Sequence, residues 1–176
     1  MESNPVLKAI YNRKSVRLYD ESVEVTKEQL EELMRAGMAA PSSRNLQPWA
    51  FIAITNRNTL NQLANGLPYA KMLFRAKAAI VVCGIPERSG QDSPEGYWVQ
   101  DCSAATQNIL LAAESIGLGA VWTGVFPRPE RVQIVKEILG IPEKVIPLNV
   151  IPIGCPNGVD KPRDKFRKDN IMWESW

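Results

Sequence analysis

Two short polar segments carry the groups best suited to binding a ligand. Residues 40–49 offer two hydroxyls, a guanidinium, two carboxamides and an indole, and prolines restrict the backbone towards both ends. In the second segment, residues 13–17, an extended backbone would project Arg13, Ser15 and Arg17 to one side. Two cations flanking a hydroxyl suit a phosphate, whereas the first segment suits a planar polar ligand. Taken singly, each segment is also compatible with a solvated turn, and for residues 13–17 the turn is the favoured interpretation.

The chain contains no histidine, which limits the chemistry that it can perform by itself. A Ser-His or Cys-His catalytic pair is excluded, the commonest metal ligand is missing, and no metal site is predicted. The three cysteines are widely spaced and odd in number, which argues against a disulfide framework, and Cys83 is expected to pack in the core. If the protein is an enzyme, its chemistry is expected to belong to a cofactor.

Length and composition predict a single domain spanning residues 1–176. Apolar residues make up 45% and charged residues 23%, values typical of a globular protein, and the net charge of +2 favours neither nucleic acid nor an anionic membrane as a partner. The N-terminus lacks the pattern of a secretory signal, and no apolar run reaches the roughly 18 residues of a membrane span. We therefore expect a cytoplasmic protein.

Apolar strands alternate with amphipathic helices, which predicts an α/β or α+β sandwich. The expected helices are 5–12, one beginning at Thr26 with a capping box to Gln29, 58–65, 68–75, 101–116 and 129–139. The expected strands are 49–54, 78–83, 120–125 and 146–153, and the prolines of the last strand favour an edge position. Residues 86–96 read as a loop that could cover a substrate, and Trp173 and Trp176 are expected to be docked.

Four separated segments together resemble the nitroreductase family of flavin mononucleotide (FMN) enzymes: residues 13–17, 41–49, 122–124 and 161–163. Their order and spacing span nearly the whole chain. The resemblance implies an α+β fold, a mixed α/β sandwich whose central, mostly antiparallel sheet is flanked by helices. It further implies an intertwined homodimer with two flavin sites at the subunit interface.

The same resemblance assigns roles to individual residues. Arg13, Lys14, Ser15 and Arg17 would bind the flavin phosphate and ribityl chain, together with Lys161 and Arg163 of the C-terminal segment. Pro41, Ser42, Ser43, Asn45 and Gln47 would approach the flavin from the other subunit. Lys71 would lie near the pyrimidine edge of the ring, and Thr123 and Gly124 near its N5 atom, with no catalytic side chain identified for certain.

The activity implied is an FMN-dependent oxidoreductase that takes a hydride from NAD(P)H and reduces nitroaromatic, quinone or similar acceptors by a ping-pong mechanism. Two departures from the family pattern leave nitro reduction open, namely Thr123 at a position where some members have an acidic residue, and a chain shorter than the better-known nitroaromatic reducers. Dehydrogenation, reductive dehalogenation and non-catalytic FMN storage are the alternatives. The sequence decides neither the acceptor nor the choice between NADH and NADPH.

Overall fold

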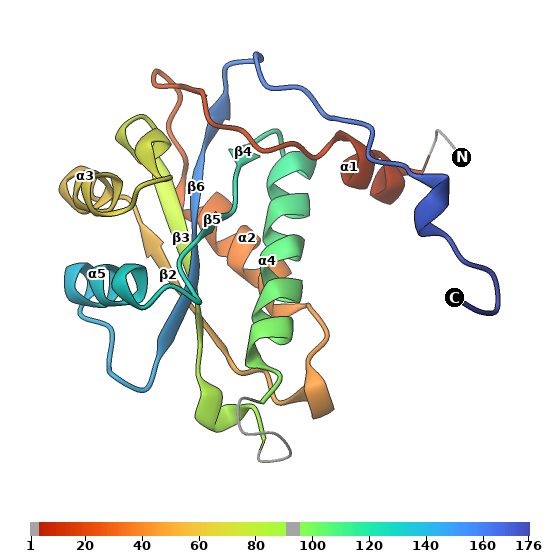
Figure 1. Cartoon of the computed structure of the whole chain (residues 1–176). Coiled ribbons are helices and arrows are strands. Elements are labelled where there is room, and N and C mark those ends of the chain that lie inside the picture. The colour runs from red at the N-terminus through yellow and green to blue at the C-terminus, as the bar shows by residue number, and fades with distance from the viewer. Residues whose placement is uncertain (1–3, 91–95) are drawn as a thin grey trace.

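The protein is built on an antiparallel sheet whose three long strands are β2 (Trp49–Ile54), β3 (Ala78–Gly84) and β6 (Ile146–Pro156). The computed structural model describes residues 4–90 and 96–176. Three two-residue strands also pair with β6, namely β1 (Tyr19–Asp20), β4 (Gly119–Ala120) and β5 (Thr123–Gly124), and the main strand order is β1-β6-β3-β2 (Figure 1). The predicted α+β class and mostly antiparallel sheet are confirmed.

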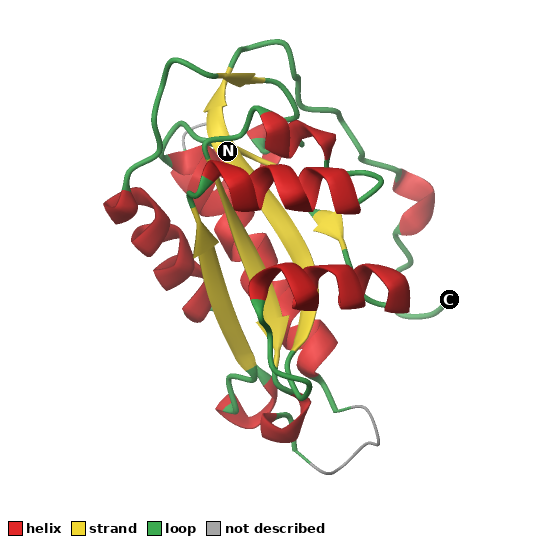
Figure 2. Ribbon diagram, turned by 90° about the vertical axis from the view of Figure 1, so that its left-hand side faces the viewer, coloured by secondary structure: helices red, strands yellow, loops and turns green. Residues whose placement is uncertain are grey.

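Helices cover both faces of this sheet. The helices α2 (Lys27–Met38) and α4 (Trp98–Ser115) lie on one face, and α3 (Arg57–Gly66) and α5 (Pro129–Leu139) lie on the other (Figure 1). Figure 2 views the molecule from the side of α3 and α5 and shows them in front of the strands. No helix in the described part of the chain is long and apolar enough to cross a membrane.

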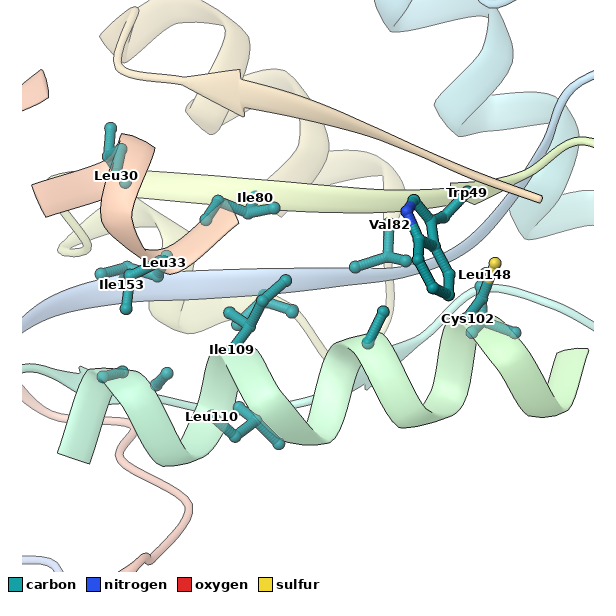
Figure 3. Close-up of a cluster of buried hydrophobic side chains, with 14 of the residues drawn as sticks. Leu30, Leu33, Trp49, Ile80, Val82, Cys102, Ile109, Leu110, Leu148 and Ile153 are labelled. Carbon is teal, nitrogen blue, oxygen red and sulfur yellow. The ribbon is translucent and has the colours of Figure 1, made fainter. Parts of the chain in front are cut away.

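Strand β3 shows why the core has two halves. All seven of its residues are buried, and because side chains alternate along a strand, Ile80 and Val82 face α2 and α4 while Val81 and Cys83 face α3 and α5. In the first half, Ile109 of α4 and Leu33 of α2 point towards the strands (Figure 3).

The start of α2 forms as the sequence predicts. The Thr26 hydroxyl accepts a hydrogen bond from the Gln29 backbone N–H at 3.2 Å, and the Gln29 side chain accepts one from the Thr26 N–H at 2.9 Å. This reciprocal capping box satisfies two donors that the helix itself leaves free. It fixes the register in which Leu30 and Leu33 face the core.

The prediction that the proline-containing strand lies at an edge is wrong, because β6 is central and pairs along both sides. Two of its three prolines lie where the pairing is irregular. Pro147 adjoins the register shift between Val82 and Cys83 of β3. Pro152 lies between Ile153, which pairs with β4, and Val150, which pairs with β5, so it is opposite the gap between these short strands. A missing N–H is tolerated where a strand leaves a gap in the ladder.

Two further predicted elements are shorter than expected. Instead of one strand over 120–125, the structure has β4 and β5 separated by residues 121–122, and within the predicted helix 68–75 only Lys71–Phe74 is helical, as the 3-10 helix η2. In the loop 86–96, residues Pro86–Arg88 form a 3-10 turn, and 91–95 lie outside the described residues.

The two ends of the chain extend away from the sheet. Helix α1 (Pro5–Asn12) has no buried residue, and the C-terminal arm, residues 157–176, runs alongside it (Figure 1). Trp173 and Trp176 are 84% and 102% exposed, so they are not docked within the chain.

Gly84→Ala is predicted to destabilise the fold. A methyl group at Gly84 would overlap the ring of Trp98, whose Cζ3 and Cδ2 atoms would lie 2.8 and 2.9 Å away. Trp98 is buried and packs edge-on against Phe126, so it cannot easily move. We expect a loss of about 1–3 kcal/mol in the free energy of unfolding, measured by urea denaturation.

Gly124→Ala is the matched control, because a methyl group there would have no atom within 4 Å. Its free energy of unfolding should stay within about 0.5 kcal/mol of the parent. Equal destabilisation of both variants would contradict the packing argument.

Candidate functional site

The two basic segments that lie far apart in the sequence border one cavity of about 520 Å³. One wall comes from the segment after α1 and the other from the first part of the C-terminal arm. The cationic residues around it are Arg13, Lys14, Arg17, Lys161, Arg163 and Lys165, and Ser15 lies among them. The structure therefore brings together all the residues predicted to hold a phosphate. We call this space the cationic cavity.

Two interactions at the central sheet fix these walls. The backbone N–H of Val16 donates to the Ala120 carbonyl at 3.0 Å, which attaches the first basic segment beside β4. The arm leaves directly from the end of β6, and the Asn157 N–H donates to the Leu18 carbonyl at 3.2 Å. Both walls of the cationic cavity are thus attached to the sheet, one beside β4 and the other at the end of β6.

Asp160 joins the two walls and was not identified from the sequence. One of its carboxylate oxygens accepts hydrogen bonds from the backbone N–H groups of Arg17 at 2.9 Å and Leu18 at 3.4 Å. Its charge also contributes to the raised pKa of the neighbouring Tyr19 hydroxyl, although burial is the larger cause. An acidic residue directly before a basic arm was the only sequence signal for this role.

Lys14 differs from the other cations because its charge is already paired. Its ammonium lies 3.1 Å from a carboxylate oxygen of Glu114 near the end of α4, and the two side chains are only 20% and 17% exposed. By contrast, no ion pair within residues 4–90 and 96–176 involves the other five cations around the cavity. An anionic ligand would therefore meet an excess of positive charge.

A second cavity of about 450 Å³ adjoins the first, and Arg17 borders both. We call it the ring cavity, and its other lining residues are Tyr69, Lys71, Met72, Val121, Trp122, Thr123 and Gly124. Gly124 faces open space, where even a methyl group would meet nothing, so a flat ligand can approach its backbone. The Thr123 hydroxyl instead donates to the Val150 carbonyl within the sheet.

Lys71 reaches this second cavity from η2. Its ammonium donates to the Ala64 carbonyl at 2.7 Å, at the C-terminal end of α3. It also donates to the Asn65 carbonyl at 3.5 Å, so one of its three donors is left for a ligand.

The predicted loop around Pro41 lies elsewhere in the same chain. Ser42, Ser43, Asn45 and Gln47 border neither cavity, and the loop bends through positive φ values at Asn45 and Gln47. The Ser42 hydroxyl accepts from the Gln47 N–H, and the Gln47 amide donates to the Asn45 side chain, both at 3.0 Å. These two bonds hold the loop in shape within its own residues.

The loop and the cationic cavity lie at opposite ends of helix α4. The Ser43 N–H donates to Asp101 at 3.0 Å near the beginning of α4, whereas Lys14 pairs with Glu114 near its end. At 1.5 Å per residue these two anchors are about 20 Å apart along the helix. Within one chain the loop therefore lies far from the cationic cavity.

The cysteines offer no reactive thiolate in the core. Burial raises the pKa of Cys83 to about 12, and burial, Asp101 and Cys83 together raise that of Cys102 to about 12. Both are free thiols buried among apolar side chains. Among the residues that the structure describes, no group of histidine, cysteine or carboxylate side chains could hold a metal ion.

Comparisons of the sequence and of the structure with known proteins agree with one another. A sequence model of the nitroreductase family matches residues 10–67 and 64–155. A protein of Archaeoglobus fulgidus that carries the provisional name NADH dehydrogenase/NAD(P)H nitroreductase is 43% identical over 97% of this chain and 98% of its own. A crystal structure from Parabacteroides distasonis with the same provisional name is 49% identical, covers 99% of this chain and 100% of that one, and superposes with a TM-score of 0.93. The FMN-dependent nitroreductase of Clostridium difficile is 27% identical, with coverage of 97% and 99% and a TM-score of 0.87.

The burial of two thiols leads to a labelling prediction. At pH 8 a maleimide should leave Cys83 and Cys102 unmodified in the folded protein, because a thiol with a pKa near 12 is almost entirely protonated and both are buried. The partly exposed Cys155 provides the internal comparison. Mass spectrometry should show no more than one label on the folded protein, and three labels after unfolding in urea. Rapid labelling of either buried thiol in the native state would contradict this packing.

Proposed function

The chain belongs to the nitroreductase family, an oxidoreductase family, and from this premise we propose that it is a homodimeric FMN enzyme. FMN, when bound, would take a hydride from NAD(P)H and pass the electrons to an organic acceptor such as a quinone or a nitroaromatic compound. In the ping-pong order, the oxidised nicotinamide would leave before the acceptor enters. The two cavities bordered by Arg17 are where the cofactor would lie.

The observation that carries this proposal is the convergence of the two basic segments on one cavity. Five cations without an ion pair among the described residues surround it, and Asp160 holds its walls together through backbone N–H groups. A phosphate dianion forms strong charge-assisted hydrogen bonds with such a donor set, and the guanidinium forks of Arg13 and Arg17 suit its oxygens. The residues present therefore fit the phosphate end of FMN.

The ring cavity fits the other end of the same molecule. It begins at Arg17, is bordered by apolar and aromatic side chains, and exposes the backbone at Gly124. Gly124 would let the flavin ring approach β5 closely, and Lys71 would place a positive charge where reduction adds a negative one. The chain would orient the cofactor, and would need no acid of its own because water that enters the open cavity can supply protons.

A second copy of the chain would complete the site. The loop containing Ser43 and the cationic cavity lie about 20 Å apart along α4, which supports the proposal that the loop at each flavin comes from the other subunit. The exposed apolar surface of α1 and the arm, including Tyr11 and Trp173, indicates where a partner would cover the chain. Obligate dimers bury surfaces of this apolar kind.

The direct test of the activity is an absorption spectrum of FMN-loaded protein under anaerobic conditions. Addition of NADH or NADPH should bleach the flavin, and a quinone or nitroaromatic acceptor should restore its colour. FMN that binds but is not bleached by either nicotinamide would support the storage alternative instead. A protein that cannot be loaded with FMN would reject the proposal.

Arg13→Ala is predicted to weaken FMN binding by about 1.5–3 kcal/mol, the usual scale for a hydrogen bond to a charged group. Titration of flavin fluorescence measures this change. Arg75→Ala is the matched control, because Arg75 pairs with Glu21 on the surface and borders neither cavity. An unchanged dissociation constant for the Arg13 variant would remove this residue from the phosphate site.

A mixed dimer tests whether the site is shared between subunits. Arg13→Ala and Asn45→Ala homodimers should both bind FMN weakly, because each has a defect in both sites. In a dimer with one subunit of each kind, one site would combine the intact Arg13 of one chain with the intact Asn45 of the other. Separately tagged subunits should therefore recover one site of parental affinity per dimer. Recovery of none would show that both residues serve the same site within one chain.

A further inference from the structure

The short turn that carries Lys71 needs support from outside itself. Helix η2 spans only Lys71–Phe74, and no side chain caps its first residue. A turn of this length has little stability of its own, because fixing its backbone is compensated by few internal hydrogen bonds. The position of the Lys71 ammonium in the ring cavity must therefore be set by neighbouring elements.

Arg57 gives that support at the end of η2. It is the first residue of α3, and its guanidinium donates to the carbonyls of Leu73 at 2.7 Å and Phe74 at 2.9 Å, and also to that of Ala76. The final carbonyls of a helical turn have no partner within the turn. One planar fork satisfies two of them, at Leu73 and Phe74, and also the carbonyl of Ala76 just beyond η2.

The opposite end of α3 holds the lysine itself. The Lys71 ammonium donates to the Ala64 carbonyl at 2.7 Å, with the Asn65 carbonyl 3.5 Å away. Arg57 and Ala64 are seven residues apart, or about 10 Å along the helix. Helix α3 thus contacts η2 at both ends, through Arg57 at its last residues and through the Ala64 carbonyl at Lys71.

We propose that Arg57 is a positioning residue that holds the Lys71 ammonium in the ring cavity and, through it, favours the reduced over the oxidised cofactor. This inference rests on the proposed function, since it assumes that FMN occupies the cavity. A fixed positive charge favours the form of a ligand that carries the extra negative charge. Without the fork, η2 would sample several positions and the average field at the ligand would fall.

The measured quantity is the dissociation constant of oxidised FMN divided by that of reduced FMN. We expect Arg57→Met to lower this ratio about tenfold, equivalent to a reduction potential about 30 mV more negative for a two-electron couple. Lys71→Met should lower it to a similar extent. The double variant should differ little from either single one, because Arg57 acts through Lys71.

Arg75→Met is the matched control. Arg75 follows η2 directly and carries the same charge, but its side chain pairs with Glu21 at 3.5 Å and donates to none of the three carbonyls. Its ratio should stay within about twofold of the parent if position rather than net charge matters. A tenfold fall in this control would overturn the proposal.

A role confined to folding would give a different result. It would lower the free energy of unfolding of Arg57→Met and leave the ratio unchanged. If Arg57→Met does not fold, Arg57→Lys is the second variant, because it keeps the charge and loses the fork, and it should still lower the ratio. Folded Arg57 variants with the parental ratio, or a double variant whose loss is the product of the single losses, would overturn the proposal.

Failure of this inference can be told apart from failure of the proposed function. A parent protein that binds FMN and is bleached by NAD(P)H, together with an unchanged ratio in the Arg57 variants, would reject only the role of Arg57. A parent protein that binds no FMN would reject both.

Discussion

The cations that converge on one cavity repel one another, and the contacts around the cavity must hold them in place against this repulsion. Five such side chains have no ion pair in the described parts of the chain, and they come from segments at opposite ends of the sequence. Like charges gathered around one cavity repel, and an anion between them would offset this repulsion. The chain holds them there with neutral backbone contacts, from Val16 to β4 and from Asn157 to Leu18, and with the single carboxylate of Asp160. This collection of positive charge is the reason why we propose an anionic ligand for the cavity.

Strand β6 links the cationic cavity to the ring cavity. The arm begins where β6 ends, and the short strands that support the first basic segment and Gly124 pair along its side. Opposite Pro152 the ladder is interrupted, and the unpaired residues Val121 and Trp122 become part of the wall of the ring cavity. Pro152, one of the prolines that made this strand look like an edge, is therefore placed where the sheet opens towards the site. The same irregularity accounts for the wrong prediction and for the cavity.

Local signals predicted more of this structure than non-local ones. The capping box at Thr26 and the buried run of β3 depend on neighbouring residues, so their patterns can be read directly. The meeting of Arg13 with Lys161 was predicted only through a family resemblance, since no periodicity connects distant segments. Asp160 and Arg57 were missed because each bonds to backbone groups, and the sequence around a backbone N–H or carbonyl does not reveal which side chain bonds to it. The separation of the Ser43 loop from the cavity became measurable only once α4 was seen to hold both.

The central claim is that the cationic cavity recognises a phosphate, and a comparison of FMN with riboflavin tests it most directly. The two ligands share the same ring and ribityl chain and differ only in the phosphate group. Calorimetric titration of the unmodified protein should show FMN binding at least about a hundredfold more tightly than riboflavin, as expected when two or more charge-assisted hydrogen bonds are lost. The difference should shrink as salt is added. Equal affinities for the two ligands would show that the converging cations do not hold the flavin, and would contradict the phosphate-binding role of the cationic cavity.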